Sequence, residues 1–491
     1  MMQFSVLTFI IGLPLLTGIA ILLLPKSEKK LPCMFALISS AVTLLLTVWV
    51  YVRYDISAGG YQFVQKMDWL PALGISYHVG VDGISLPLVL LAGVVVACGV
   101  AISWNIIERQ REFFSYLMFL AASVFGVFCS LDLFMLFFFF ELAVFPKYLM
   151  ILIWGSPKTR EYGAMKLTLY LFLGSVVALV GVLAMVFASG ANTFNLLELE
   201  KAGFNPEFQR LWFPFIFFGF AVLGGIFPFH SWAPDGHVAA PTAVSMLLAG
   251  VEMKVGAFAA LRVGIMLLPD GARSWALFIL TLGTVNVVYG ALIALVQTDF
   301  KYVIGFSSVS HMGLVMIGFA TLNREGLLGA GLQMFSHGVM TALFFAIVGM
   351  VYDRTHTRDI GQLGGLIHVM PLAAIGFIVA GLVSMGMPGF SGFVAEFPIF
   401  MGTWKTAPLV AVVAVLGIIV TAAYILLVVR RVFFGNMSEG TAGQIGDVGR
   451  LDKITVVFLS LIMIAIGLFP SLMVPMIDSG VDRILLLLGG R

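Results

Sequence analysis

The chain alternates between long apolar segments and short polar connections. A helix that spans a bilayer needs ~20 consecutive, mainly apolar residues. This pattern predicts an all-α polytopic membrane protein with about 14 transmembrane helices. The expected spans are 4–25, 31–52, 80–105, 113–130, 132–154, 164–189, 211–229, 240–268, 275–297, 302–321, 326–352, 368–403, 408–432 and 454–476.

Two of these segments contain glycine and proline where a helix would otherwise continue. "GGIFPFHSWAP" with Pro228 breaks helix 7, and "GMPGFSG" with Pro388 breaks helix 12. Such breaks survive in a membrane only where protein or a water-filled cavity satisfies the freed backbone groups. Breaks at corresponding places in two halves predict an internal repeat. We expect two five-helix repeats, helices 4–8 (113–268) and helices 9–13 (275–432), inverted because each contains an odd number of helices.

The polar connections predict one membrane domain and its orientation. The longest, 53–79, 190–210 and 433–453, are too short for a soluble domain, so residues 1–491 form a single membrane domain. Lys and Arg are more frequent in the connections that lie inside if the N-terminus lies outside. The positive-inside rule therefore predicts that both termini lie outside.

Composition agrees with a membrane protein and excludes several kinds of chemistry. The chain is 60% hydrophobic and 11% charged, whereas soluble domains carry about 25% charged residues. There is no phosphate-binding loop, no G-x-G-x-x-G after a strand, and no C-x-x-C among its 3 cysteines. We expect no catalytic residue, no metal and no cofactor in this chain. Its net charge of +2 gives no indication of a nucleic-acid partner.

A charged pair interrupts the most apolar part of the chain, "FFFFELAVFPKYLM". Glu141 lies nine residues beyond Asp132, which places it ~13 Å along the fifth helix. Ionisable residues inside a membrane cost ~2.5–3.5 kcal/mol each, so each is a functional hypothesis. A buried carboxylate whose cation can leave and return is a proton relay element; an ion pair that only holds helices together is the alternative. Lys147 lies on a different face and cannot pair directly with Glu141.

Further ionisable residues occur in later helices. Glu252 and Lys254 are two residues apart, so they face different neighbours and each needs a partner on another helix. Arg262 lies nearer the outer end, where snorkelling is the simpler interpretation. His311 and His337 interrupt apolar helices, either as proton carriers near neutral pH or as neutral side chains with one hydrogen bond. With Glu396 after the second break, the sequence predicts a central polar line of Glu141, Lys254, His311, His337 and Glu396.

Six motifs in order resemble a known family. They are "GVDGISLPLVLL", "FFFFELAVFPKYLMILIWG", "FPFHSWAPDGHVAAPTAVSMLLAGVEMKVGA", "QTDFKYVIGFSSVSHMGLV", "QMFSHGVMTALFF" and "GMPGFSGFVAEF". The chain resembles the antiporter-like subunits of proton-pumping NADH:quinone oxidoreductase, respiratory complex I. The family's functional positions fall on Glu141, Lys254, His311, His337 and Glu396. Glutamate at 396 favours the M-type subunit, because the L- and N-type subunits and the multisubunit antiporters tend to carry lysine there.

The resemblance implies a function and a setting. It implies a non-redox subunit of a proton-translocating NADH:quinone oxidoreductase, in the cell inner membrane, beside L- and N-type subunits and lipid. Three alternatives stay open: a subunit of a multisubunit Na+/H+ antiporter, a subunit of a membrane-bound hydrogenase or ferredoxin-driven relative, and a structural scaffold.

The chain departs from the family pattern at one position. The family has a lysine in helix 7, five residues before the proline of the break, where this chain has Leu223. We expect Lys147 to supply the displaced positive charge, through water or by reaching toward helix 7. Glu252 is expected to take part in the same rearrangement.

Overall fold

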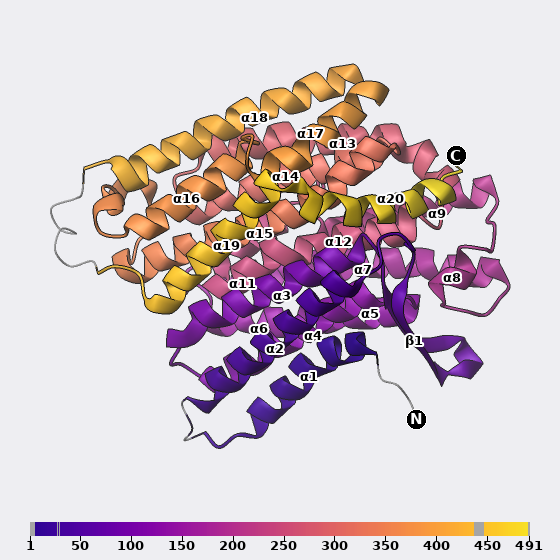
Figure 1. The fold of residues 1–491 in the computed structure, drawn as a ribbon, viewed down its shortest axis with the longest axis horizontal. Coiled ribbons are helices and arrows are strands. Elements are labelled where there is room, and N and C mark those ends of the chain that lie inside the picture. Colours follow the sequence, from indigo (N-terminus) through magenta and orange to yellow (C-terminus); the bar gives the residue numbers. More distant parts are fainter. Residues whose placement is uncertain (1–4, 27, 29, 437–445, 490–491) are drawn as a thin grey trace.

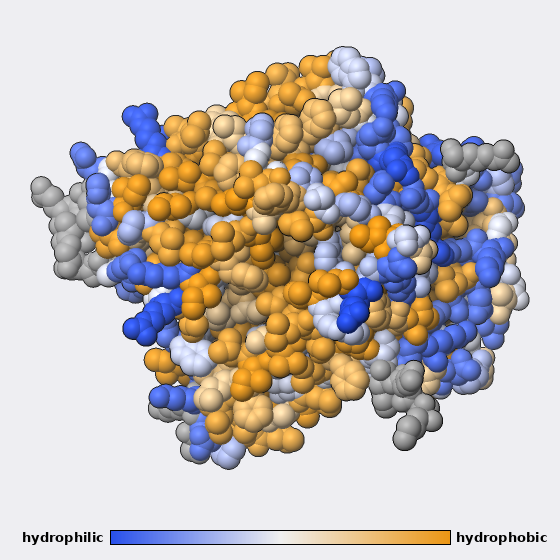
Figure 2. All heavy atoms as spheres, viewed as in Figure 1, coloured by the Kyte–Doolittle hydropathy of each residue, from blue (hydrophilic) through white to orange (hydrophobic). Residues whose placement is uncertain are grey.

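The computed structural model describes residues 5–26, 28, 30–436 and 446–489. Within them, twelve helices are long and apolar enough to cross a membrane. The helices run side by side, and the starts and ends of most of them gather at two opposite ends of the molecule (Figure 1). Figure 2 shows apolar side chains across the middle, between polar side chains at the two ends. The all-α polytopic class is confirmed.

Ten of the long helices, or pairs of helices, match single expected spans. They are α1 (Val6–Leu23), α2 (Leu31–Arg53), α3 (Ser85–Ile102), α4 (Gln110–Cys129), α5 (Leu133–Leu142) with α6 (Val144–Trp154), α7 (Arg160–Ser189), α13 (Pro269–Val296), α14 (Phe300–Ala320), α15 (Arg324–Thr355) and α19 (Arg450–Leu468). The α5–α6 boundary follows from Pro146, which has no N–H to donate to the carbonyl of Leu142. The count of fourteen and the inverted repeats stay predictions.

The two expected breaks are present. Helix α9 (Pro206–Leu223) ends before Pro228, and α10 (Trp232–Ala239) follows it. Helix α16 (Pro371–Ser384) ends before Pro388, and α17 (Ser391–Thr406) follows it. Expected spans 211–229 and 368–403 are therefore not continuous helices. After the second break, the chain continues through α18 (Pro408–Val428) and a π-helical turn, η7 (Val429–Phe434).

One side chain of the neighbouring helix α13 and one of α10 itself satisfy backbone groups at the first break. The amide of Asn286 on α13 accepts a hydrogen bond from the Phe227 N–H at 2.6 Å and donates to the Gly225 carbonyl at 2.8 Å. The Trp232 indole N–H donates to the Val222 carbonyl at 2.8 Å. These bonds replace those that the helix loses at the break, as the absence of water in lipid requires.

Two strands and two further helices were not expected as separate elements. Strands β1 (Gln62–Leu70) and β2 (Ile75–Val81) form an antiparallel pair, so the expected start of a helix at residue 80 is wrong. Helix α3 begins later because Asp82 accepts the N–H of Ser85 at 2.9 Å. The other two elements are short helices, α8 (Leu196–Leu199) and α20 (Val474–Leu487). The hairpin and α20 lie at the end of the molecule where the described chain begins and ends (Figure 1); we call this the hairpin end.

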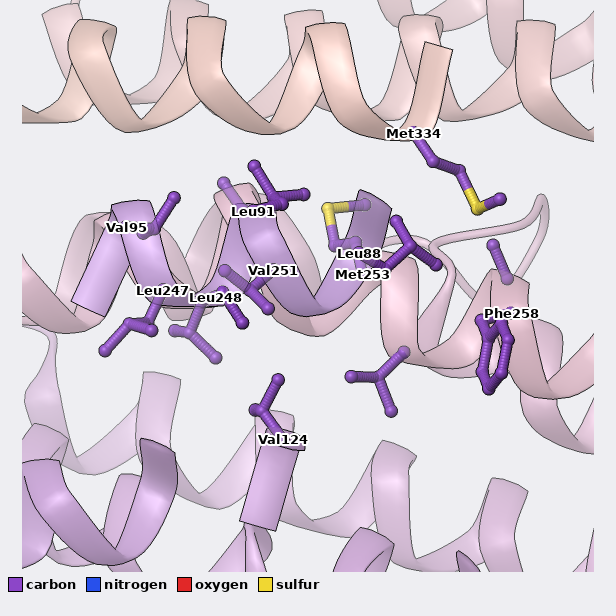
Figure 3. Close-up of a cluster of buried hydrophobic side chains, with 14 of the residues drawn as sticks. Leu88, Leu91, Val95, Val124, Leu247, Leu248, Val251, Met253, Phe258 and Met334 are labelled. Atoms are coloured by element: carbon purple, nitrogen blue, oxygen red, sulfur yellow. The ribbon is translucent and has the colours of Figure 1, made fainter. Parts of the chain in front are cut away.

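The expected span 240–268 is an irregular helix through the centre. It consists of α11 (Thr242–Leu247), the π-helical turn η3 (Leu248–Glu252), α12 (Met253–Ala259) and the π-helical turn η4 (Ala260–Ile265). All residues from 243 to 265 are buried. Figure 3 shows apolar side chains of this helix among others from its neighbours, including Leu88, Val124 and Met334. π-Helical turns occur mostly inside α-helices and often at functional sites.

Candidate functional site

The central helix and α15 bring a lysine and a histidine together. Lys254 on α12 has no exposed surface, and His337 on α15 is 1% exposed. The Lys254 Nζ lies 2.8 Å from the His337 Nδ1 and also donates a hydrogen bond to the Ala249 carbonyl. A buried ammonium group is costly without partners, so these two contacts account for a lysine in the middle of the protein.

A second pair joins α14 and α17. The His311 Nδ1 lies 3.3 Å from the Glu396 Oε1. The Gln333 amide nitrogen bridges them, 3.2 Å from the His311 Nδ1 and 3.3 Å from the Glu396 Oε1. The other ring nitrogen of His311 lies 2.9 Å from the hydroxyl of Ser384, the last residue of α16. The second helix break therefore places a hydroxyl beside the histidine.

The two pairs meet through their histidines. The ring centroids of His311 and His337 are 5.3 Å apart. The order in space is therefore Lys254, His337, His311 and Glu396, and not the order along the chain that the sequence suggested. The His337 Nε2 and the Glu396 Oε2 have no hydrogen-bond partner among the described atoms. Since buried polar atoms are normally satisfied, these two atoms are positions where a water or a proton can be accepted. We call these four residues the central chain.

Lys147 does not reach toward helix 7. It lies in the first turn of α6, and its ammonium group forms an ion pair with Glu252 of η3, each side chain being 1% exposed. The expectation of a contact with the broken helix is wrong because α9 offers only apolar Leu223 there, 3% exposed. The structure does bring Lys147 and Glu252 together. The Glu252 Oε1 has no hydrogen-bond partner among the described atoms.

Glu141 does not lie in the central chain. It is half-buried on α5, on the same face as Phe138 and Phe145, which are 44% and 64% exposed. It lines a groove of about 620 Å³ whose other walls are mainly apolar side chains of α5 and α7. In the described part of the chain no hydrogen bond or ion pair of its carboxylate occurs. The expected line of five residues is therefore corrected to four connected residues and a separate, laterally placed glutamate.

A buried ion pair at the hairpin end was missed from the sequence. The Arg262 guanidinium binds both oxygens of Asp82, at 2.6 and 2.8 Å, and each residue is 2% exposed. Snorkelling is therefore the wrong interpretation of Arg262. Burial acts to raise the pKa of Asp82, but the Arg262 charge outweighs it and the pKa is lowered. The sequence did contain one sign of this ion pair, which is the aspartate in the apolar motif "GVDGIS".

A cavity at the opposite end was also missed. It has a volume of about 290 Å³ and is lined in part by Ser103, Trp154, Asp353, Arg358 and Lys301. The Lys301 Nζ donates to the Ala240 carbonyl at 2.7 Å and lies 3.2 Å from the Ser245 hydroxyl. Ser245 belongs to α11, so this cavity borders the helix that carries Lys254.

Residues 130–425 match the model of the family described as "NADH:quinone oxidoreductase/Mrp antiporter, TM". The chain belongs to this family. Among curated relatives, chain 4 of the NAD(P)H-quinone oxidoreductase of Gloeobacter violaceus is 37% identical, over 96% of this chain and 90% of the relative. Subunit M of the NADH-quinone oxidoreductase of Rickettsia prowazekii is 35% identical, over 99% of this chain and 100% of the relative.

Solved structures of the family have the same fold. A chain of respiratory complex I from Thermus thermophilus superposes with a TM-score of 0.91 at 27% identity, covering 99% of this chain and 100% of that one. A chain of the Mrp complex from Dietzia has a TM-score of 0.89 at 20% identity, covering 99% and 98%. At that identity the second match shows the fold alone. The identity with subunit M and chain 4 confirms the resemblance to the M-type subunit.

Proposed function

We propose that the chain translocates protons as a non-redox subunit of a complex I-type NADH:quinone oxidoreductase, through the central chain Lys254, His337, His311 and Glu396. The observation that carries this proposal is that these four buried side chains form two polar pairs whose histidine rings pack against each other. Structural helix packing needs no such pairs, because each ionisable group in a membrane interior is costly. Their chemistry is that of proton transfer, and no bond to an organic substrate is formed or broken.

Each member has a role that its chemistry suits. Lys254 takes up a proton and passes it to His337 across 2.8 Å. An imidazole accepts a proton on one nitrogen and releases it from the other, so the two histidines carry the proton toward α17. Glu396 receives it, with Gln333 holding the carboxylate in place. Water completes the steps that exceed hydrogen-bond distance.

The ends of the path lie beyond these four residues. The cavity beside Lys301 is the proposed entrance, because it opens at the end of the molecule whose connections carry Lys158, Arg160 and Arg358, which the positive-inside rule places inside. Glu141 stays in the proposal as a translocation residue, because a carboxylate in a lateral apolar groove is retained only for a function or a partner.

The setting of this activity follows from the relatives. Those named subunit M or chain 4 belong to quinone oxidoreductases. We propose that this chain lies in the cell inner membrane as a multi-pass subunit beside L- and N-type subunits. Quinone reduction in other subunits would alter the charges along the central chain and drive protons through it.

Proton pumping by the complex reconstituted in liposomes tests the proposal. The complex containing Lys254→Met or His337→Gln is placed in liposomes, and NADH oxidation and interior acidification are followed together. We expect native assembly and at least a twofold loss of protons moved per electron. The control is Thr403→Val, a nearly isosteric change at a buried hydroxyl on α17 that bonds only the Ile399 carbonyl. Native pumping by both Lys254→Met and His337→Gln would overturn the proposal. A requirement of proton transport for Na+ would favour the antiporter alternative.

A further inference from the structure

Each histidine of the central chain uses one ring nitrogen for its own pair and turns the other away from it. His337 contacts the Lys254 ammonium group through Nδ1, at 2.8 Å, and its Nε2 has no hydrogen-bond partner among the described atoms. His311 faces Glu396 through Nδ1, at 3.3 Å. The Nε2 of His311 lies 2.9 Å from the hydroxyl of Ser384. A proton that passes between the pairs therefore leaves His337 at Nε2 and enters His311 at Nε2.

We propose that Ser384 is a relay residue, which receives the proton that leaves His337 and hands it to His311. Tyr424 positions the Ser384 hydroxyl for this step. The inference rests on the proposed function, because it supplies the link between the two pairs of the same path. Ser384 exchanges the proton itself, whereas Tyr424 acts only through Ser384 and is a positioning residue.

The surroundings of the His311 ring leave this route open and no other. Each imidazole nitrogen has one hydrogen or one lone pair in the ring plane, so it makes one main hydrogen bond. The Glu396 Oε1 and the Gln333 amide nitrogen face Nδ1, at 3.3 and 3.2 Å. The hydroxyl of Ser384, which is 1% exposed, occupies the place at Nε2. Because a relay through an imidazole uses both nitrogens, the group at Nε2 belongs to the path as much as Glu396 does.

A serine hydroxyl suits this step because it donates one hydrogen and accepts at two lone pairs. The Oγ–H bond of Ser384 breaks as an Nε2–H bond of His311 forms. A water beside His337 donates a proton to the same oxygen and takes one from the Nε2 of His337. On the far side of the His311 ring, the Nδ1–H bond breaks and the proton passes to the Glu396 carboxylate. Ser384 is therefore unchanged after each transfer.

Tyr424 gives the Ser384 hydroxyl a second acceptor. Tyr424 on α18 is 1% exposed, and its hydroxyl donates to the Ser307 Oγ at 2.7 Å and also interacts with the Ser384 side chain. Since the hydrogen of Tyr424 is committed to Ser307, its oxygen is free to accept. The Ser384 hydroxyl thus has an acceptor in both states, which is the Nε2 of His311 before the transfer and the Tyr424 oxygen after it.

The second helix break brings the groups on both sides of the His311 ring into place. Ser384 is the last residue of α16, and Gly386 follows with a φ of 61°. This turn comes so close to the glutamate that a Cβ at Gly386 would lie 2.7 Å from the Glu396 Oε2. The break therefore supplies the hydroxyl at Nε2 and packs against the carboxylate that faces Nδ1.

Aromatic rings separate the hydroxyl groups from the end of the molecule where α14 begins. Phe300 lies seven residues before Ser307 on α14. The same spacing separates Phe377 from Ser384 on α16. Seven residues are about two helical turns, or ~10 Å, so each ring lies on the same face as its hydroxyl. The two rings have no exposed surface and their centroids are 5.2 Å apart. Ser384 therefore receives its proton from the side of His337 and not from that end.

Ser384→Ala in the intact complex in liposomes is the first test, with NADH oxidation and interior acidification followed together. We expect native assembly and at least a twofold loss of protons moved per electron. The space left by one hydroxyl is smaller than the share of a water, about 30 Å³, so water does not replace the lost group. The matched control is Ser310→Ala, the same change next to His311, because that hydroxyl donates only to the Val287 carbonyl at 2.9 Å. Pumping by Ser384→Ala equal to this control would overturn the inference.

Tyr424→Phe is the second test, and it carries the test if Ser384→Ala does not assemble. It removes one hydroxyl at nearly constant volume, and we expect a smaller loss of pumping than with Ser384→Ala. Since Tyr424 acts only through Ser384, the double variant is expected to pump as Ser384→Ala does, whereas two independent structural losses would add. The control is Tyr54→Phe, a tyrosine 5% exposed whose hydroxyl donates to the Gly60 carbonyl at 2.7 Å. Additive losses, or pumping by Tyr424→Phe equal to this control, would count against the inference.

Failure of the proposed function gives a different result from failure of this inference. The proposed function fails if Lys254→Met and His337→Gln both pump natively. If those two variants lose pumping while Ser384→Ala keeps it, the proposed function stands and the relay through Ser384 is wrong.

Discussion

Asn286→Leu is expected to destabilise the first helix break. Asn286 is 1% exposed, and its side chain accepts from the Phe227 N–H at 2.6 Å and donates to the carbonyls of Gly225 and Val309, at 2.8 and 3.3 Å. Leucine has nearly the same volume but neither donates nor accepts hydrogen bonds. The N–H of Phe227 and the carbonyl of Gly225 lie outside α9 and α10, so both groups would lose their partner.

The magnitude follows from the number of groups left unsatisfied. Each buried polar group without a partner costs about 1–3 kcal/mol, so two such groups cost roughly 2–6 kcal/mol. The Val309 carbonyl lies within α14 and adds little, since it also accepts within the helix. Asn286→Asp keeps the acceptor for Phe227 but loses the donor, so its effect on stability is expected to differ from that of the leucine variant.

The assay is the thermal stability of the detergent-extracted complex, measured as the temperature at which half of it is lost from the size-exclusion peak. Ser310→Ala is the matched control, because its hydroxyl also crosses between α13 and α14, to the Val287 carbonyl at 2.9 Å. That change is expected to cost only about 0.5–1.5 kcal/mol. If the leucine variant were no less stable than the alanine control, Asn286 would not be what satisfies the break.

Two further changes test charged groups away from the central chain. Asp82→Asn leaves the buried Arg262 without its counter-charge and is expected to lower the stability of the folded chain by about 3–5 kcal/mol. The loss is measured as a smaller amount of assembled complex on native gels. Arg262→Lys keeps a positive charge and is expected to have a smaller effect. Because the folded-state pKa of Asp82 is lowered, its contribution to folding stability is present above about pH 4 and is lost as pH falls below that value. The native complex should therefore lose stability below about pH 4, whereas the Asp82→Asn complex should show a smaller change. Glu141→Gln is expected to assemble normally, because its carboxylate has no bond within the described chain, yet to lower pumping per electron; normal pumping would remove Glu141 from the proposed path.

Hydropathy and motif order predicted the parts of the fold that depend on local sequence. Apolar segment length is sufficient to place a spanning helix, and glycine with proline is sufficient to place Pro228 and Pro388 in breaks. The hairpin of β1 and β2 was missed because it lies in a polar connection, where no periodic pattern distinguishes a strand from a loop. The buried pair of Asp82 and Arg262 was missed because snorkelling and burial share the same sequence signal.

The site residues were identified by type but not by their contacts. An isolated charge in an apolar helix is visible in any sequence, which is why Lys254, His337 and Glu396 were found. Whether such a charge points to the centre depends on the rotation of its helix about its own axis, which neighbouring helices determine. Glu141 was therefore placed in the centre although it faces a lateral groove. For the same reason Lys147 was expected beside α9, whereas it meets Glu252.

The hairpin end has a consequence for how the protein is made. The hydroxyl of Tyr51 on α2 donates to the Leu472 carbonyl at 2.7 Å, across 421 residues, and Arg483 of α20 stacks 4.4 Å above the ring of Tyr61. At about 5–20 residues per second, translation separates these partners by roughly 20–85 s. The early helices enter the membrane long before their final contacts exist. During that interval the hairpin end lacks α20, and ribosomal stalling before residue 470 would hold the protein in that state.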